Sequence, residues 1–159
     1  MKISTRGRYA LEALLDLALH AGMETEQLSR VARRRGLSEN YLEQIFMVLK
    51  EHGIVESTRG ARGGYRLVKA PECITAGEVL RALEGPLAPV ACVTSDPSRP
   101  ACSRMGKCVT RALWIRIMEG LDEVTDTVTL RDLAEFALSQ PAQQQGGVGL
   151  EEGAGQYEI

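Results

Sequence analysis

The chain has 159 residues, of which 44% are hydrophobic, and a formal net charge of −2. That length suits one domain with an additional element, and the apolar content is sufficient for a core. No apolar run approaches the roughly eighteen residues of a membrane-spanning helix, so we predict a cytoplasmic protein without membrane contact. Glu12 and Asp16 interrupt the apolar part of the N-terminal stretch, which indicates an amphipathic helix rather than a signal peptide.

The charge is divided unevenly along the chain. Residues 1–70 carry twelve Lys and Arg against eight Asp and Glu, a net of +4, whereas residues 71–159 carry seven against thirteen, a net of −6. A basic N-terminal half suits a polyanionic partner such as DNA. We do not expect an enzyme, because the sequence has no glycine-rich phosphate loop, only two histidines and no nucleophile with a partnered histidine.

Three segments near the N-terminus show the spacing of helices. Apolar residues at every third or fourth position over 10–22 predict a first helix. Thr25 is the expected N-cap of a short second helix, and Gly36 is its expected left-handed stop. Behind the N-cap Ser38, a third helix is expected over 39–52, apolar on one side and polar on the other. Two short helices joined by a tight glycine turn indicate a helix-turn-helix.

Two short strand-like runs follow, Ile54–Thr58 and Tyr65–Val68, and the segment RGARGG between them is too rich in glycine for regular structure. They predict a β-hairpin whose basic tip carries Arg59 and Arg62. A helix-turn-helix followed by such a hairpin is a winged helix. The tip would bring its arginines to a narrow DNA groove, where glycine allows close approach of the backbone.

The second half of the chain is expected to begin with a helix capped by the T-x-x-E box of Thr75 and Glu78. Apolar positions over 109–124 then step by three and four, which predicts a helix of about twenty residues. We interpret its apolar stripe as a dimerisation face. Thr129 and Asp132 are expected to cap a short last helix.

The predicted fold is mainly α (α+β), a winged helix-turn-helix with a small β-hairpin wing and a long dimerisation helix. Its expected divisions are residues 1–85 for the winged-helix DNA-binding domain, 86–108 for a cysteine-containing sensor loop, 109–140 for the dimerisation helix and short terminal helix, and 141–159 for a disordered tail. Cys92, Cys102 and Cys108 share the loop with spacing C-x9-C-x5-C. Such a loop indicates a metal site or a thiol sensor, whereas Cys73 stands apart and is interpreted as an incidental or packing cysteine.

Four stretches of the sequence resemble the group of bacterial winged-helix repressors that includes IscR, NsrR and CymR. They are MKISTRGRY, LSENYLEQ, VESTRGARGGY and ITAGEVLRALEG, and the resemblance extends over residues 1–138. It implies a homodimer that binds a pseudo-palindromic operator in double-stranded DNA. It also implies that the recognition helix enters the major groove and the wing arginine enters the minor groove.

The resemblance carries DNA-binding roles onto matching positions. Glu43 and Gln44 become the base-reading candidates, because Glu accepts from cytosine N4 and Gln pairs with adenine. Ser38, Asn40 and Tyr41 lie beside them, and Arg59 is the minor-groove candidate. The phosphate-binding candidates are Ser4, Arg6, Arg8 and Arg33. The alternatives are that these cations are ordinary exposed side chains and that Tyr41 packs in the core.

Members of the group that are similar to IscR and NsrR hold an iron–sulfur cluster through three loop cysteines, which implies a [2Fe–2S] cluster on Cys92, Cys102 and Cys108. The fourth ligand is open, because Arg111 replaces the histidine of IscR-like members and Arg8 replaces the acidic residue of NsrR-like members. Candidates for it are His20, His52, Glu12, Asp16, Asp96 and a small-molecule thiol. Zinc and unligated thiols are the alternatives, although no CxxC pair occurs.

The resemblance implies a repressor whose operator binding is tuned by the cluster and which controls iron–sulfur cluster biogenesis, cysteine metabolism or both. CymR-like members lack the cluster and respond to cysteine metabolism through O-acetylserine sulfhydrylase, an enzyme that captures C-terminal isoleucine tails. The phrases ITAGEVLRALEGPLAPV and ALWIRI are CymR-like, and this sequence ends in QYEI with Ile159 last. A cluster-free regulator that acts through that enzyme is therefore the alternative.

Overall fold

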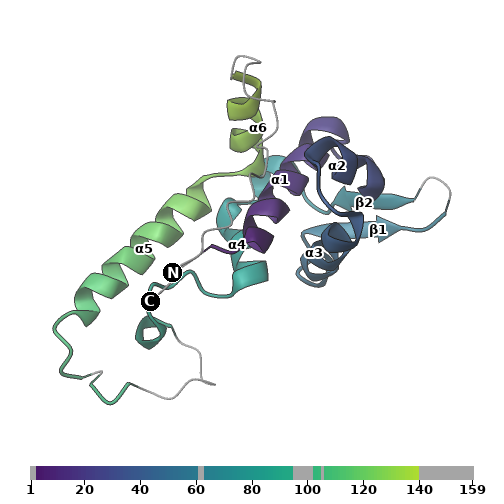
Figure 1. Cartoon of the computed structure of the whole chain (residues 1–159). Helices are drawn as coiled ribbons and strands as arrows, with labels where there is room; N and C mark the ends of the chain where they lie inside the picture. The colour runs from purple at the N-terminus through teal and green to yellow at the C-terminus, as the bar shows by residue number, and fades with distance from the viewer. Residues whose placement is uncertain (1–2, 61–62, 95–101, 105, 140–159) are drawn as a thin grey trace, which may run out of the picture.

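The computed structural model describes residues 3–60, 63–94, 102–104 and 106–139, so Arg62, Asp96 and the predicted tail lie outside it (Figure 1). Its elements in chain order are α1 (Thr5–His20), α2 (Leu28–Arg35), α3 (Glu39–Glu51), β1 (Val55–Thr58), β2 (Gly64–Leu67), the 3-10 helix η1 (Pro71–Cys73), α4 (Ala76–Glu84), the 3-10 helix η2 (Ala91–Val93), α5 (Arg111–Thr127) and α6 (Leu130–Ser139). None of these helices is long and apolar enough to cross a membrane. The prediction of a mainly α winged helix-turn-helix is confirmed.

The helix-turn-helix consists of α2 and α3. Gly36, at φ 64°, adopts the left-handed conformation that ends α2, as predicted. Ser38 occupies the N-cap position of α3, although its side chain makes no capping hydrogen bond. The predicted cap at Thr25 is wrong, because α2 begins at Leu28. The neighbouring Glu26 forms a β-bridge with β2, and this pairing keeps the segment before α2 extended.

The hydrophobic core lies among α1, α2, α3 and α4 and continues to the base of the hairpin. Its largest fully buried side chains include Leu14, Leu17, Leu42, Ile45, Phe46, Leu49, Ile54, Leu67, Ile74 and Leu130. The Phe46 ring of α3 meets the Tyr65 ring of β2 edge to face, with 5.0 Å between centroids. Recognition helix and wing are therefore packed on the same core.

The hairpin is fixed to the body of the domain through β2. β1 and β2 pair antiparallel, with Thr58 opposite Gly64 near the tip. The backbone N–H of Tyr65 donates to the carbonyl of Glu26 at 2.8 Å, and the N–H of Glu26 donates back at 2.9 Å. A Cβ on Gly64 would lie 2.2 Å from that Glu26 oxygen, so this close approach requires glycine.

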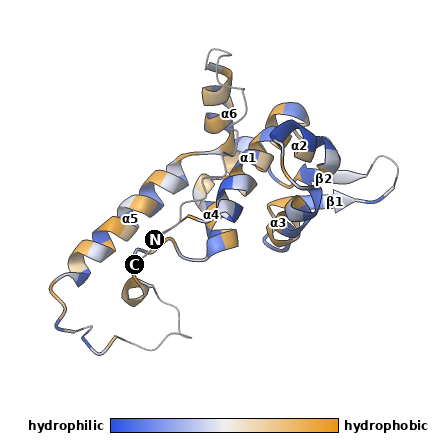
Figure 2. Ribbon diagram, in the orientation of Figure 1, coloured by the Kyte–Doolittle hydropathy of each residue, from blue (hydrophilic) through white to orange (hydrophobic). Residues whose placement is uncertain are grey.

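The second half of the chain attaches to this domain through α4. Thr75 accepts the N–H of Glu78 at the start of α4, as the capping box predicts. The N–H groups of Thr129 and Asp132 are each accepted by the other's side chain, at 2.8 and 3.1 Å, which confirms the predicted cap of α6. The predicted long helix is α5, which begins at Arg111 and has 17 residues. It extends away from the domain, with hydrophobic segments along its length (Figures 1 and 2).

Candidate nucleic-acid interface

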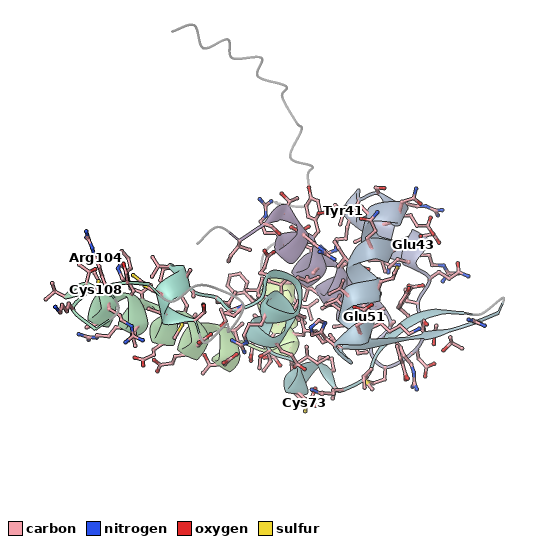
Figure 3. All side chains as sticks on the ribbon, turned by 90° about the horizontal axis from the view of Figure 1, so that it is seen from below. Tyr41, Glu43, Glu51, Cys73, Arg104 and Cys108 are labelled. Carbon is pink, nitrogen blue, oxygen red and sulfur yellow. The ribbon has the colours of Figure 1, made fainter. Side chains whose placement is uncertain are left out.

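The predicted base-reading residues lie on the outer face of α3. Ser38, Asn40, Glu43 and Gln44 are exposed, whereas the opposite face of the helix is buried. Tyr41 is half-buried, and its ring meets the Tyr9 ring of α1 edge to face with 6.0 Å between centroids. This aromatic contact supports the packing alternative for Tyr41. Figure 3 places Glu43 at the opposite end of the molecule from Cys108.

Contacts between α3 and the hairpin make them one surface. Arg59 directly follows β1 and is exposed. Burial of the Tyr65 ring, followed by the negative charge of Glu43 on α3, raises the pKa of Tyr65. Lys50 Nζ donates to Ser57 Oγ at 2.6 Å, joining α3 to β1. Sequence reasoning missed Lys50 and Ser57, because their contact depends on how the hairpin folds back over the helix.

The phosphate candidates have different surroundings. Arg8 is exposed and Arg6 is half-buried at the start of α1, and Arg33 is exposed on α2. Ser4 is the N-cap of α1, since its Oγ accepts the N–H of Arg6 at 3.1 Å. The same hydroxyl donates to the Glu84 carboxylate, so its single hydrogen is committed within the protein. The three arginines are therefore better suited than Ser4 to bind phosphate.

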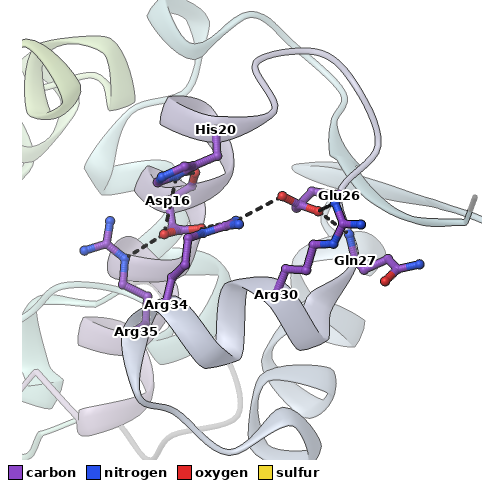
Figure 4. A network of polar contacts seen from close by, with 7 residues as sticks. All are labelled: Asp16, His20, Glu26, Gln27, Arg30, Arg34 and Arg35. Atoms are coloured by element: carbon purple, nitrogen blue, oxygen red, sulfur yellow. Dashed lines mark hydrogen bonds and ion pairs between the residues drawn. The ribbon is translucent and has the colours of Figure 1, made fainter.

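A buried carboxylate organises the segment before the recognition helix (Figure 4). Asp16 of α1 is 1% exposed, and its Oδ1 accepts two hydrogen bonds from Arg34, at 2.6 and 2.9 Å. Its Oδ2 accepts from Arg35 Nε at 3.1 Å and lies 3.5 Å from His20 Nδ1. Arg34 also donates to Glu26 at 3.1 Å. The hydrogen bond to Asp16 is the main reason that the pKa of Arg34 lies above its ordinary value.

This network links α1 and α2 to strand β2 of the wing, because Glu26 is also the residue bridged to β2. It directs the guanidinium groups of Arg34 and Arg35 to Asp16, whereas the exposed Arg33 takes no part in the network. The network also corrects the set of candidates for a fourth cluster ligand. Asp16 is already occupied by two guanidinium groups, so it does not fit that role.

The loop cysteines lie in a different part of the molecule. Cys92 is half-buried on η2, which packs against α5, whereas Cys102 is exposed and Cys108 is half-buried shortly before α5. Within the described ranges, no three His, Cys, Asp or Glu side chains are grouped so that they could hold a metal ion. The Thr110 hydroxyl, bonded to the Cys108 sulfur at 3.3 Å, is the main cause that lowers the pKa of Cys108. A lowered pKa favours the thiolate, the form that binds metals.

Arg111 takes the position of the histidine that the resemblance implies as a ligand. Its backbone N–H donates to the carbonyl of Cys108 at 3.2 Å, and its side-chain Nε is buried without a hydrogen-bond partner among the residues described. A guanidinium group stays protonated and has no acceptor site, so Arg111 does not fit as a ligand. The loop cysteines would therefore supply three thiols to a cluster that takes four protein ligands, and Arg111 does not supply the fourth.

Comparison with known proteins shows that this chain is similar to bacterial transcriptional regulators. Residues 3–135 match the family described as Rrf2, iron-dependent transcriptional regulator. The chain is 44% identical over 136 residues to the transcriptional regulator CymR of Bacillus subtilis (strain 168), covering 86% of this chain and 91% of that relative. It is 35% identical over 133 residues to IscR of Erwinia tasmaniensis, covering 84% and 78%. The solved structure of T. potens IscR aligns with a TM-score of 0.70 at 39% identity, covering 90% of this chain and 93% of that one.

Proposed function

Because this chain belongs to the Rrf2 family and is a DNA-binding transcriptional regulator, we propose that it acts as a repressor that binds a pseudo-palindromic operator as a homodimer. The observation that carries the proposal is the exposed polar face of α3 beside a wing fixed to the same core. Its relatives are named as transcriptional regulators, in agreement with the expectation that it is not an enzyme.

The proposed contacts follow from the chemistry of each exposed group. Glu43 accepts a hydrogen bond from cytosine N4 and Gln44 pairs with adenine in the major groove, with Ser38 and Asn40 beside them. Arg59 enters the adjacent minor groove. Phosphate contacts from Arg6, Arg8 and Arg33 set the register of the domain on DNA.

We assign the homodimer interface to α5. Its outward apolar residues are large and exposed, with Leu113 at 54%, Ile117 at 38% and Val124 at 63%. Such a stripe on a helix without buried residues suits a second copy of the same helix. Two-fold symmetry would then present the two recognition helices to half-sites about one DNA turn apart.

Glu43→Ala is expected to relax the choice of base at one operator position in each half-site, because the acceptor for cytosine N4 is lost. At that position the preference should fall by about tenfold. Selection of bound sequences from random DNA, followed by dissociation constants for single-base variants, measures the change. Glu51→Ala is the matched control, since Glu51 is an exposed carboxylate in the last turn of the same helix.

Arg59→Ala and Arg6→Ala distinguish groove contact from phosphate contact in the same experiment. Arg59→Ala should weaken binding to the operator, whereas Arg6→Ala should weaken binding to all DNA sequences alike and reduce the salt slope of binding by about one unit.

For the earlier variant Glu43→Ala, an unchanged sequence preference would contradict the assignment of α3 as the reading helix.

We further propose that the loop over 86–108 is a sensor in which Cys92, Cys102 and Cys108 hold a [2Fe–2S] cluster. Support comes from the three thiols in one loop, the lowered pKa of Cys108 and the similarity to IscR. When bound, the cluster would supply reversible one-electron redox chemistry. The loop precedes α5, and η2 packs on α5. A cluster that ordered the three cysteines would therefore change the contacts that position the proposed dimer helix.

Each of the substitutions Cys92→Ala, Cys102→Ala and Cys108→Ala is expected to abolish most of the bound iron while leaving the fold unchanged. The measurements are iron content per chain and visible absorbance after anaerobic purification, with circular dichroism as the check on folding. Cys73→Ala is the matched control, because Cys73 is an exposed cysteine on η1 outside the loop.

A cluster-free regulator of cysteine metabolism is the second candidate, and the higher identity to CymR than to IscR favours it. It would act through O-acetylserine sulfhydrylase, with Ile159 as the captured residue; Ile159 lies outside the described ranges. Wild-type protein that is colourless and iron-free after anaerobic purification from iron-replete cells would overturn the cluster proposal and leave this candidate.

A further inference from the structure

The long helix α5 is joined to the winged-helix domain without a hydrophobic core of its own. None of its residues is buried, and none belongs to the core cluster. The neighbouring helix α4 is held firmly in the domain, where Val79 is 0% and Leu80 is 3% exposed. The angle between α5 and the DNA-reading domain is therefore decided by the contacts at the junction of these two helices.

That junction is closed by a polar clamp. Arg81 of α4 donates through Nη1 to Asp122 Oδ1 at 2.9 Å and through Nη2 to Asp126 Oδ1. The two aspartates are one helical turn apart, so a single face of α5 meets both Nη atoms of one planar guanidinium group. The hydrogen bond to Asp126 is the main reason that the pKa of Arg81 lies above its ordinary value.

Two further features hold the same junction close. A Cβ on Gly77 would lie 2.1 Å from Asp126 Oδ1 and 2.9 Å from Thr125 Oγ1, so α4 meets α5 with bare backbone there. Beyond the end of α5, backbone hydrogen bonds of 2.8 and 2.9 Å join residues 74–76 to residues 128–130. The backbone bonds anchor one end of α5, and the clamp fixes the direction in which the rest of the helix leaves.

We propose that Arg81 is a specificity-determining residue that sets the separation of the two recognition helices in the dimer. The inference rests on the proposed function, because it requires dimerisation through α5 and an operator with two half-sites. Both half-sites are bound together only when the recognition helices match their spacing. The partner subunit binds to α5, and α4 belongs to the DNA-binding domain. The angle between α4 and α5, which the Arg81 clamp fixes, therefore sets the separation of the two recognition helices.

The exposure of the clamp separates this geometric role from a role in stability. The side chains of Arg81, Asp122 and Asp126 are 35%, 39% and 45% exposed. Ion pairs with this much solvent contribute little to folding, so loss of Arg81 leaves the winged helix intact. Loss of Arg81 instead allows the angle of α5 to vary, because α5 has no buried residue that would hold it in place. Lysine would retain the charge but not the fork that reaches two carboxylates at once.

The test measures the penalty for changing the spacing of the half-sites. An operator selected by the wild-type protein from random DNA is lengthened by two base pairs at its centre, and fluorescence anisotropy gives the dissociation constants for both DNAs. The insertion is expected to weaken wild-type binding about a hundredfold, because the half-sites can no longer be bound together. With Arg81→Gln the penalty falls to about tenfold or less, with affinity for a single half-site unchanged, and Arg81→Lys lies between them.

Arg131→Gln is the matched control, because Arg131 is 59% exposed and pairs at 3.0 Å with Glu135 inside α6. It should retain the wild-type penalty. The inference is overturned if Arg81→Gln also retains that penalty, or if this variant sediments as a monomer, since Arg81 would then act on assembly. A wild-type chain that is monomeric, or indifferent to spacing, overturns the proposed homodimer together with this inference.

Discussion

Replacing Phe46 with alanine is expected to lower the free energy of unfolding by about 3–5 kcal/mol. Phe46 is 0% exposed, and its ring lies edge to face with Tyr65 across the contact between α3 and β2. Removal of the ring leaves a cavity where recognition helix and wing share their core. Urea denaturation followed by circular dichroism measures the loss, and operator affinity should fall with it because the two reading elements lose their common support.

The next residue on the same helix supplies the control. Met47 is 59% exposed on the outer side of α3, so Met47→Ala should change the free energy of unfolding by no more than about 0.5 kcal/mol. Equal losses in the two variants would contradict the assignment of the inner and outer faces of α3, and with it the choice of Glu43 and Gln44 as base-reading residues.

Asp16→Asn is expected to lower the free energy of unfolding by about 2 kcal/mol, less than the usual cost of breaking a fully buried ion pair. Asp16 itself is buried, but the side chains of Arg34 and Arg35 are 30% and 28% exposed. Water can therefore replace some of the hydrogen bonds that the carboxylate accepts from the two guanidinium groups. The loss is measured by urea denaturation at neutral pH.

Two further variants test whether the network is the cause. Glu24→Gln neutralises an exposed carboxylate close in the chain and should be nearly neutral. The double variant Asp16→Asn with Arg34→Gln should be less destabilised than the sum of its singles by about 1 kcal/mol, since both remove the same contact. Strict additivity would show that the contact between Asp16 and Arg34 does not contribute to stability.

The winged helix could be predicted because its signals act over a few residues. A left-handed Gly36, polar and apolar faces that alternate along α3, and two strand-like runs around RGARGG each specify local structure. The structure confirms these elements with shifts of a residue or two at their ends. The cap at Thr25 failed for a tertiary reason, since the neighbouring Glu26 pairs with a strand that comes much later in the chain.

The cysteine loop marks the limit of prediction from the residues. Spacing in the chain identifies Cys92, Cys102 and Cys108 as neighbours in sequence, but a loop rich in proline and glycine does not specify how its side chains approach one another in space. The missing histidine at Arg111 can be read from the sequence alone. Which group completes the ligand set depends on folding and assembly, whereas the iron measurement proposed above tests the three cysteines.

By itself, the sequence determined the fold class, the polar outer face of α3 and the set of thiols, because periodicity, caps and turns are properties of near neighbours. Only the tertiary structure decided the partners of polar side chains that are distant in the sequence. Asp16 meets Arg34 18 positions away, Arg81 meets Asp126 45 positions away and Ser4 meets Glu84 80 positions away. Such contacts form only when separate helices have packed together, so no local pattern in the sequence encodes them.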